Sequence, residues 1–206
     1  MTRQSRHHRR QAKLIALTGT PGTGKKSIAP LLCKLLGVEP IGLAELASSI
    51  STGSASGELE VSSSKLRRKL LADSPSSALV FGHMVPDVLR RGEVEFAAVL
   101  RCEPSELKKR LAARGYSDDK VTENVEAELI GVLLDSSLRA FGEAVVHEYD
   151  TTGLAPASVA RRIARDYRGA RAHNDQKQFI DWTFRYDSST RLRSLLSAPA
   201  RGPAST

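Results

Sequence analysis

The chain has 206 residues, of which 40% are hydrophobic and 26% are charged, and this composition excludes a disordered protein. Its length suits one globular domain with appendages, and its apolar runs are too short to span a membrane or to direct secretion, so we expect a cytoplasmic protein. The net charge of +8 permits binding to polyanions such as RNA, although basic ends can also serve only solubility. Cys33 and Cys102 lie in apolar segments and are predicted to be reduced core residues.

A glycine-rich turn follows the first predicted strand, after residues 1–12, which we expect to form a flexible basic arm. From Gly19 to Ser27 the sequence is Gly-Thr-Pro-Gly-Thr-Gly-Lys-Lys-Ser, and an apolar helix follows it. Glycines allow successive N–H groups to point inward as an anion-binding nest at a helix start. The spacing predicts a P-loop in which Lys25 reaches the β- and γ-phosphates of ATP. The alternative is a glycine-rich turn that binds no nucleotide.

The position after Lys25 departs from the P-loop pattern. A serine or threonine hydroxyl there normally binds Mg²⁺, but this chain has Lys26, and its first hydroxyl belongs to Ser27. Either Ser27 or a water takes over the metal, or Mg²⁺ is held weakly while Lys26 adds positive charge beside the phosphates. Ser27 is therefore the candidate metal ligand.

A second strand is predicted at residues 38–41, and a short helix begins at 43–47. The stretch 48–64 is rich in serine and glycine and is predicted to be a mobile insert. Nucleoside monophosphate kinases have their acceptor-binding segment directly after the second strand, which in this chain is about residues 42–65. The alternative is that these residues form an ordinary solvent-exposed loop. Helical periodicity returns at 65–71, where the cations can be only a solvated face.

The third predicted strand, residues 78–81, leads to His83 at the carboxyl edge of the sheet, where open α/β folds bind ligands. His83 either orients water and transfers a proton, or is a hydrogen-bonded loop residue. Many P-loop enzymes carry an acid for Mg²⁺ at this strand end, but here Phe81 and Gly82 occupy the place. Asp87 is the nearest substitute.

After a fourth strand at residues 96–101, a helix ends in cations at Arg114, beside Gly115. We expect Arg114 to close over the transferring phosphate within a lid of about residues 113–123. The alternative is a charge that only stabilises a helix C-terminus.

One long helix is predicted from Asp118 to about Phe141, because apolar residues recur there at helical spacing. Its polar face is expected to carry Glu123, Glu126 and Glu128. A last strand at 144–149 follows, with His147 in a structural role, and then a helix that begins at Pro156. Five strands with intervening helices predict an α/β fold: a five-stranded, doubly wound parallel sheet with helices on both faces, as in P-loop NTPases of the nucleoside monophosphate kinase type.

The kinase domain is predicted to span residues 13–168, and a basic, aromatic extension follows at 169–206. Aromatic residues between cations can stack on RNA bases and contact phosphates. They can also attach the extension to the domain, which we favour for Phe179 and Trp182. Residues beyond Leu196 are rich in proline and alanine and are expected to be disordered.

Several stretches together resemble the adenylate kinase 6 family, small archaeal and eukaryotic kinases and ATPases linked to maturation of the small ribosomal subunit. They occur in the order and spacing of that family and are residues 19–25, 99–101, 114–117, 124–128 and 146–148. The resemblance spans about residues 14–153.

The resemblance implies that ATP binds through Gly22, Gly24, Lys25, Lys26 and Ser27, under a lid that starts at Arg114. It implies phosphoryl transfer to AMP with accompanying ATP hydrolysis, and a partner that is a small-subunit ribosomal protein beside the rRNA. His83 matches a histidine of the family, but the acid that precedes that histidine in eukaryotic members is missing here. Because this departure and Lys26 both concern the metal, the alternative is a weakly catalytic, nucleotide-gated assembly factor that binds RNA and ribosomal protein.

Overall fold

A computed structural model describes residues 13–50, 62–73, 77–169 and 179–197 of the chain. The predicted basic arm at 1–12, the middle of the predicted insert at 51–61 and the chain end at 198–206 lie outside the described residues. The expectations about their mobility therefore stay predictions.

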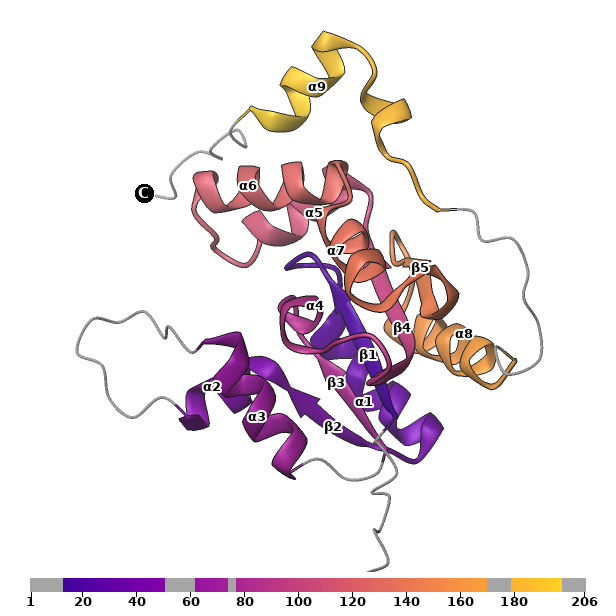
Figure 1. Ribbon diagram of the computed structural model, residues 1–206. Coiled ribbons are helices and arrows are strands. Elements are labelled where there is room, and N and C mark those ends of the chain that lie inside the picture. Colours follow the sequence, from indigo (N-terminus) through magenta and orange to yellow (C-terminus); the bar gives the residue numbers. More distant parts are fainter. Residues whose placement is uncertain (1–12, 51–61, 74–76, 170–178, 198–206) are drawn as a thin grey trace, which may run out of the picture.

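Five strands form one parallel sheet in the order β2-β3-β1-β4-β5 (Figure 1). They are β1 (Leu14–Gly19), β2 (Glu39–Gly42), β3 (Ala78–Phe81), β4 (Val94–Arg101) and β5 (Val146–Asp150). The central strand β1 pairs with β3 on one side and β4 on the other, so that Gly19 at its end lies opposite Leu100. The predicted five-stranded parallel sheet is confirmed.

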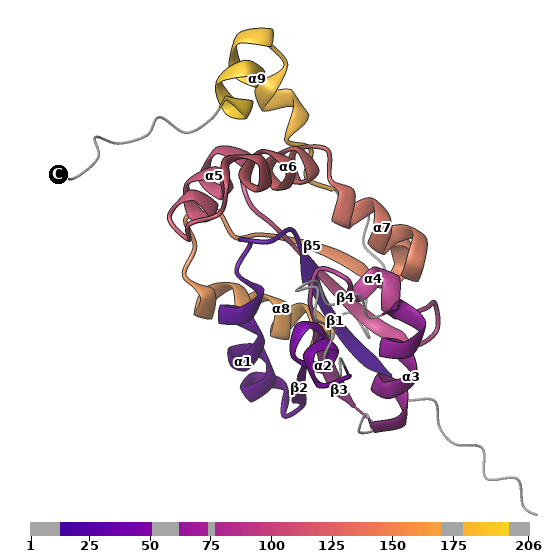
Figure 2. The ribbon, with the colours of Figure 1, turned by 90° about the vertical axis from the view of Figure 1, so that its left-hand side faces the viewer.

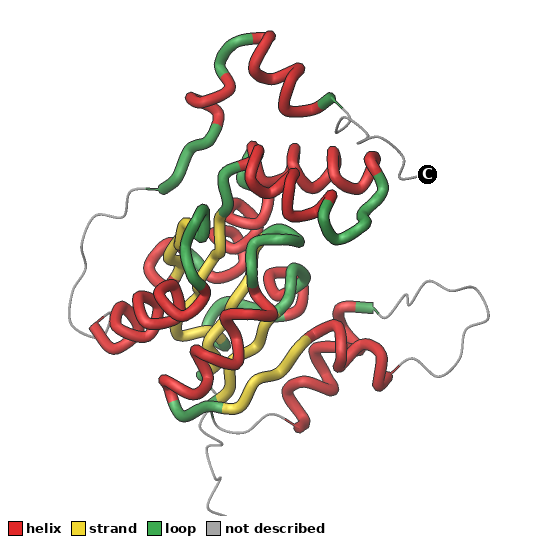
Figure 3. Tube along the Cα trace, turned by 180° about the vertical axis from the view of Figure 1, so that it is seen from behind, coloured by secondary structure: helices red, strands yellow, loops and turns green. Residues whose placement is uncertain are grey.

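Helices cover both faces of this sheet, as Figures 1 and 3 show from opposite sides. They are α1 (Lys25–Leu36), α2 (Leu43–Ile50), α3 (Ser63–Asp73), α4 (Val85–Val88), α5 (Pro104–Ala112), α6 (Asp118–Leu129), α7 (Val132–Phe141), α8 (Pro156–Gly169) and α9 (Ser189–Leu196), with short 3₁₀ helices at Glu143–Val145 and Thr183–Tyr186. None of the helices in the described ranges is long and apolar enough to cross a bilayer.

The two faces of β1 explain the two main cores. Successive side chains of a strand point to opposite faces, and a parallel sheet buries both. Leu14 and Ala16 pack with residues of α3, α4 and α7, whereas Ile15 and Leu17 pack with α1 and α8. The apolar sides of the helices therefore bury both faces of the sheet, and polar side chains that can bind a ligand lie in the loops at the strand ends.

A third apolar cluster lies beyond the sheet, where α5 and α6 pack together. It contains Cys102 and Leu111 and is completed by Trp182 and Leu195 from the C-terminal segment. Figure 2 shows α9 on the far side of α5 and α6 from the sheet. Trp182 is only 4% exposed, so the expectation that it attaches the extension to the domain is confirmed.

The single long helix predicted between Asp118 and Phe141 is wrong. The chain forms two helices, α6 and α7, which meet at Gly131 in a left-handed conformation with φ of +72°. Apolar spacing continues across the break because both helices bury one face, so periodicity alone does not reveal it. The last strand also begins later than predicted, at Val146, after a 3₁₀ turn.

The two cysteines are free and buried, as predicted. Burial raises the pKa of the Cys33 thiol to about 11 and that of Cys102 to about 12. Both therefore stay protonated at neutral pH and serve as small apolar side chains.

Candidate functional site

The glycine-rich loop between β1 and α1 folds around the side chain of Lys25. The Lys25 amine donates to the backbone carbonyl of Thr20 at 3.0 Å and to that of Gly19. Gly22 has φ of +96°, and a Cβ there would come within 2.6 Å of the Leu107 side chain in α5. Glycine at this position is therefore required both by the backbone and by the packing of α5 against the loop.

A cavity of about 390 Å³ lies against this loop. It is lined by Pro21, Gly22, Gly24, Lys25, Lys26, Ser27, His83, Arg114 and Tyr116. The predicted catalytic, nucleotide-binding and metal-binding residues thus lie at one cavity, although the elements that carry them are far apart in the chain. Their roles stay predictions. Asp87, the nearest substitute for the missing acid, is not in the lining of this cavity. A larger cavity of about 620 Å³, between α5 and the C-terminal segment, has none of these residues in its lining.

The charges of the cavity suit an anionic ligand. Burial lowers the pKa of Lys25 to about 8; the carboxylate of Glu128 acts in the opposite direction, and Arg114 lowers the pKa further. Burial also lowers the pKa of His83, and the nearby charge of Lys25 adds to this effect, while Asp87 opposes it. His83 is therefore neutral at pH 7 and can accept a hydrogen bond or a proton.

Lys26 lies in the cavity lining, but its side chain is exposed, unlike that of Lys25. Its amine forms an ion pair with Glu45 at 3.3 Å, and both side chains are mostly exposed. Backbone hydrogen bonding, followed by the pairing with Lys26, lowers the pKa of Glu45. The ion pair joins the start of α1 to the first turn of α2, so the predicted acceptor segment begins directly beside the glycine-rich loop.

The described lining offers Mg²⁺ the hydroxyl of Ser27 and no carboxylate. Mg²⁺ in kinases keeps several waters and is usually held by one or two carboxylates together with substrate phosphates, so here the phosphates and waters would supply most of its ligands. This lining suits a metal that the phosphates themselves hold. The described residues contain no cluster of three or more histidine, cysteine or acidic side chains that could hold a metal ion in the absence of phosphates.

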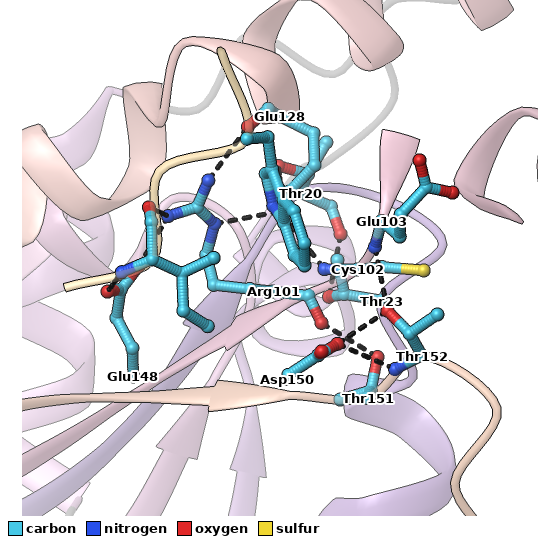
Figure 4. Close-up of polar contacts among 12 residues, drawn as sticks. Thr20, Thr23, Arg101, Cys102, Glu103, Glu128, Glu148, Asp150, Thr151 and Thr152 are labelled. Atoms are coloured by element: carbon cyan, nitrogen blue, oxygen red, sulfur yellow. Dashed lines mark hydrogen bonds and ion pairs between the residues drawn. The ribbon is translucent and has the colours of Figure 1, made fainter. Parts of the chain in front are cut away.

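Glu128 is not on a polar face, which corrects the prediction. Its side chain is 1% exposed, whereas Glu123 and Glu126 are exposed as expected. One carboxylate oxygen, Oε2, accepts a hydrogen bond from the Thr20 hydroxyl at 2.6 Å, and Oε1 accepts from Nε of Arg101 at 2.7 Å (Figure 4). Burial is possible because these partners compensate the charge.

The sequence contains a signal that Glu128 is buried. Glu128 lies three residues after Val125 and seven after Val121, and this spacing puts it on the apolar stripe of α6. Arg101 is likewise a charged residue in a buried apolar element, because it is the last residue of β4. Its side chain also forms an ion pair with Glu148 of β5. A charged residue at an apolar position predicts a buried partner of opposite charge, and here three such residues share one network.

His147 lies outside the cavity lining and stacks on Phe96, with ring centroids 4.4 Å apart. This packing between β4 and β5 agrees with the structural role expected for it.

Comparisons with known proteins agree with the motif and the fold. The family model of the AAA domain matches residues 15–131, more than half of the chain. A protein of Thermococcus onnurineus described as "Putative adenylate kinase" is 35% identical over 176 residues, covering 84% of this chain and 93% of the relative. A relative with the same description from Thermococcus gammatolerans is 36% identical over 176 residues, covering 84% and 95%.

Among solved structures, a shikimate kinase from Acinetobacter baumannii in complex with shikimate matches with a TM-score of 0.51, covering 78% of this chain and 96% of that one. At 21% identity, this likeness shows the fold alone, a P-loop kinase fold. The loop around Lys25, the strand order and the extent of these matches lead to one conclusion: the chain belongs to the family of AAA-domain P-loop proteins that contains these archaeal relatives of adenylate kinase type.

Proposed function

We propose that the protein is an adenylate kinase that transfers the γ-phosphoryl group of ATP to AMP, forming two ADP, and that also hydrolyses ATP. The observation that carries this proposal is the cavity in which Lys25, Arg114 and His83 meet at the glycine-rich loop. The descriptions of the archaeal relatives support the choice of reaction.

Charge neutralisation and positioning supply the catalysis in this proposal, and no side chain acts as a nucleophile. The loop amides, with Gly22 and Gly24, and the Lys25 amine bind the phosphates, while Arg114 closes over the transferring group. When bound, Mg²⁺ neutralises phosphate charge, and Ser27 is its protein ligand. In hydrolysis, neutral His83 orients the attacking water.

AMP is proposed to bind along the segment of about residues 42–65. The Lys26–Glu45 pair supports this location, because its 3.3 Å contact makes the first turn of α2 a neighbour of the phosphate-binding loop. An acceptor bound there is close to the transferred phosphate. The middle of the segment, 51–61, lies outside the described residues.

We further propose that the enzyme acts in the cytoplasm in maturation of the small ribosomal subunit, with a ribosomal protein and rRNA as partners. The net charge of +8 and the family resemblance support this role. Within the C-terminal segment, Trp182 is buried, whereas Phe184 is 80% exposed and Arg185 follows it. Phe184 is therefore the aromatic side chain of this segment best placed to stack on a base.

The deciding experiment measures ADP formation from ATP and Mg²⁺ with and without AMP. We expect AMP to stimulate ADP formation strongly, and Lys25→Ala and Arg114→Ala to abolish it. His83→Ala should lose AMP-independent hydrolysis while it still binds nucleotide. Lys34→Ala serves as the matched control, because Lys34 is an exposed lysine of the same helix α1 outside the cavity.

Slow ADP formation whose rate does not change when AMP is added would instead support the second candidate, a nucleotide-gated assembly factor with little catalysis. The lack of a carboxylate in the described cavity lining is the observation that favours this candidate. Full activity of Lys25→Ala would reject both.

A further inference from the structure

One carboxylate connects the phosphate-binding loop with the C-terminal segment, residues 179–197. Oε2 of Glu128 accepts from the Thr20 hydroxyl of the loop at 2.6 Å. Oε1 of Glu128 accepts from the indole N–H of Trp182 at 3.2 Å, from the backbone N–H of Cys102 at 3.0 Å and from Arg101. Thr20 and Trp182 are thus separated by a single side chain.

The donors are shared unevenly between the two carboxylate oxygens. Each oxygen has about two lone-pair sites, and Oε1 accepts from three donors while Oε2 accepts from one, so Oε1 is fully occupied. The side chains of Glu128 and Arg101 are 1% and 2% exposed, so water cannot replace a lost partner. A shift of any one donor therefore disturbs the carboxylate that the others share.

The C-terminal segment has a second attachment to the same network. Arg101 pairs with Glu148, whose Oε2 accepts from the backbone N–H of Ile180 at 2.6 Å. Arg101 also donates to the Ile180 carbonyl at 3.3 Å. Trp182 thus contacts Glu128 directly, and Ile180 is connected to it through Arg101. Glu128 in turn contacts the loop at Thr20.

We propose that Glu128 is a positioning residue that fixes the phosphate-binding loop through Thr20 and couples it to the docking of residues 179–197 through Trp182. Binding at the loop then strengthens docking of the segment, and, because coupling free energies are reciprocal, docking strengthens binding at the loop. The nucleotide half of this inference rests on the proposed function. The proximity of the Glu128 charge to Lys25, visible in its effect on the lysine pKa, agrees with it.

The segment also offers a matched control. The Tyr186 hydroxyl donates to Glu103, which lies outside the Glu128 network. Tyr186→Phe removes only a hydroxyl donor, whereas Trp182→Phe removes the indole N–H together with part of a buried ring, and both keep an aromatic side chain. Only the Trp182 substitution removes a partner of Glu128.

The first test needs no nucleotide and measures amide hydrogen exchange. We expect Trp182→Phe to speed exchange of the Thr23 and Ser27 amides, which donate to the loop carbonyls of Thr20 and Gly24 at 3.2 and 3.0 Å, roughly fivefold, the effect of one hydrogen bond on an equilibrium. Tyr186→Phe should leave these amides unchanged, and the β3 amides at 78–81 should stay protected in both variants. Equal loop exchange in the two variants, whether slow or fast, would overturn the proposal.

The second test uses the unaltered chain, in which Trp182 is the single tryptophan. Titration with a non-hydrolysable ATP analogue should change the Trp182 emission with the same midpoint as the heat of binding measured by calorimetry. Thr20→Val should still bind the analogue, with a weaker affinity, and lose most of the emission change. Heat without an emission change in the unaltered chain would reject the coupling. Absence of heat would count against the proposed function, and the exchange comparison would still decide the coupling.

Discussion

Lys25 shows both what the loop costs, the burial of a cation, and what the loop can do, which is to bind an anion. Its amine is buried and donates to two loop carbonyls, and burial lowers its pKa to about 8. The folded chain thus keeps a cation where water solvates it poorly, and a phosphate group supplies the counter-charge that the loop lacks. The same loop therefore favours a bound anion at neutral pH.

This lowered pKa predicts proton uptake when ATP binds. In the free protein Lys25 loses its proton as the pH rises through about 8, and bound phosphates favour the charged amine, so its pKa rises in the complex. At about pH 8.5 binding should take up a proton at Lys25, while at about pH 7 this uptake should be much smaller. Calorimetry in two buffers of different ionisation enthalpy measures the uptake.

Lys25→Arg is the control for this prediction, because arginine stays charged over the whole range. The variant should bind ATP without the additional uptake at the higher pH. Equal uptake in both proteins would assign the proton to another group, of which His83 in the same cavity is the first to examine.

At the scale of elements, the break between α6 and α7 decides where α7 packs. The last turn of α6 holds Glu128, and Gly131 then separates the two helices in a left-handed conformation with φ of +72°. A continuous helix through this point would carry the following residues away from α4, against which α7 packs. The left-handed glycine thus sets the direction in which α7 leaves α6.

Gly131→Ala should lower the free energy of unfolding by about 1 kcal/mol, because an L-residue resists the left-handed conformation. An added Cβ would meet Arg101 only at 3.7 Å, an ordinary contact, so backbone strain is the whole effect. Gly169→Ala, at the end of α8, has open space and no positive φ, and should be neutral or slightly stabilising. Urea unfolding measures both, and an unchanged midpoint for Gly131→Ala would contradict this account of the break.

At the scale of the whole molecule, the C-terminal segment belongs to the folded domain. Trp182 and Leu195 complete the apolar cluster on α5 and α6, and both are 4% exposed. Lys108 of α5 adds a polar attachment, since its amine donates to the carbonyls of Leu195 at 2.7 Å and Ser197 at 2.6 Å. A cation at the C-terminal end of α9 satisfies carbonyls that have no partner in the helix.

Lys108→Met should loosen α9 without unfolding the sheet. We expect chymotrypsin to cut the segment near exposed Phe184 roughly fivefold faster, because a docking hydrogen bond is lost. The urea midpoint of the domain should stay the same. Lys109→Met, an exposed neighbour on the same helix, is the control, and equal cleavage of both variants would show that Lys108 does not hold α9.

The sequence alone determined the parallel sheet, the glycine-rich loop and the residues that line its cavity. These features depend on local rules, namely strand and helix periodicity and the spacing from Gly19 to Lys25, and parallel topology then brings loops from the same sheet edge together. His83 was predicted from the sheet edge, and Arg114 from the cations at the end of a helix beside Gly115; the structure shows both at the cavity.

Only the tertiary structure decided the fate of Glu128 and of the C-terminal segment. Thr20 and Glu128 are 108 positions apart, and Trp182 and Glu128 are 54 apart, so no local pattern encodes their contacts. Whether a glutamate at an apolar helix position is buried depends on cations and donors that distant elements supply. The break at Gly131 is different, because a glycine within a helical pattern is itself a local signal for a helix end. Only the packing of α7 against α4 shows that the chain ends a helix there.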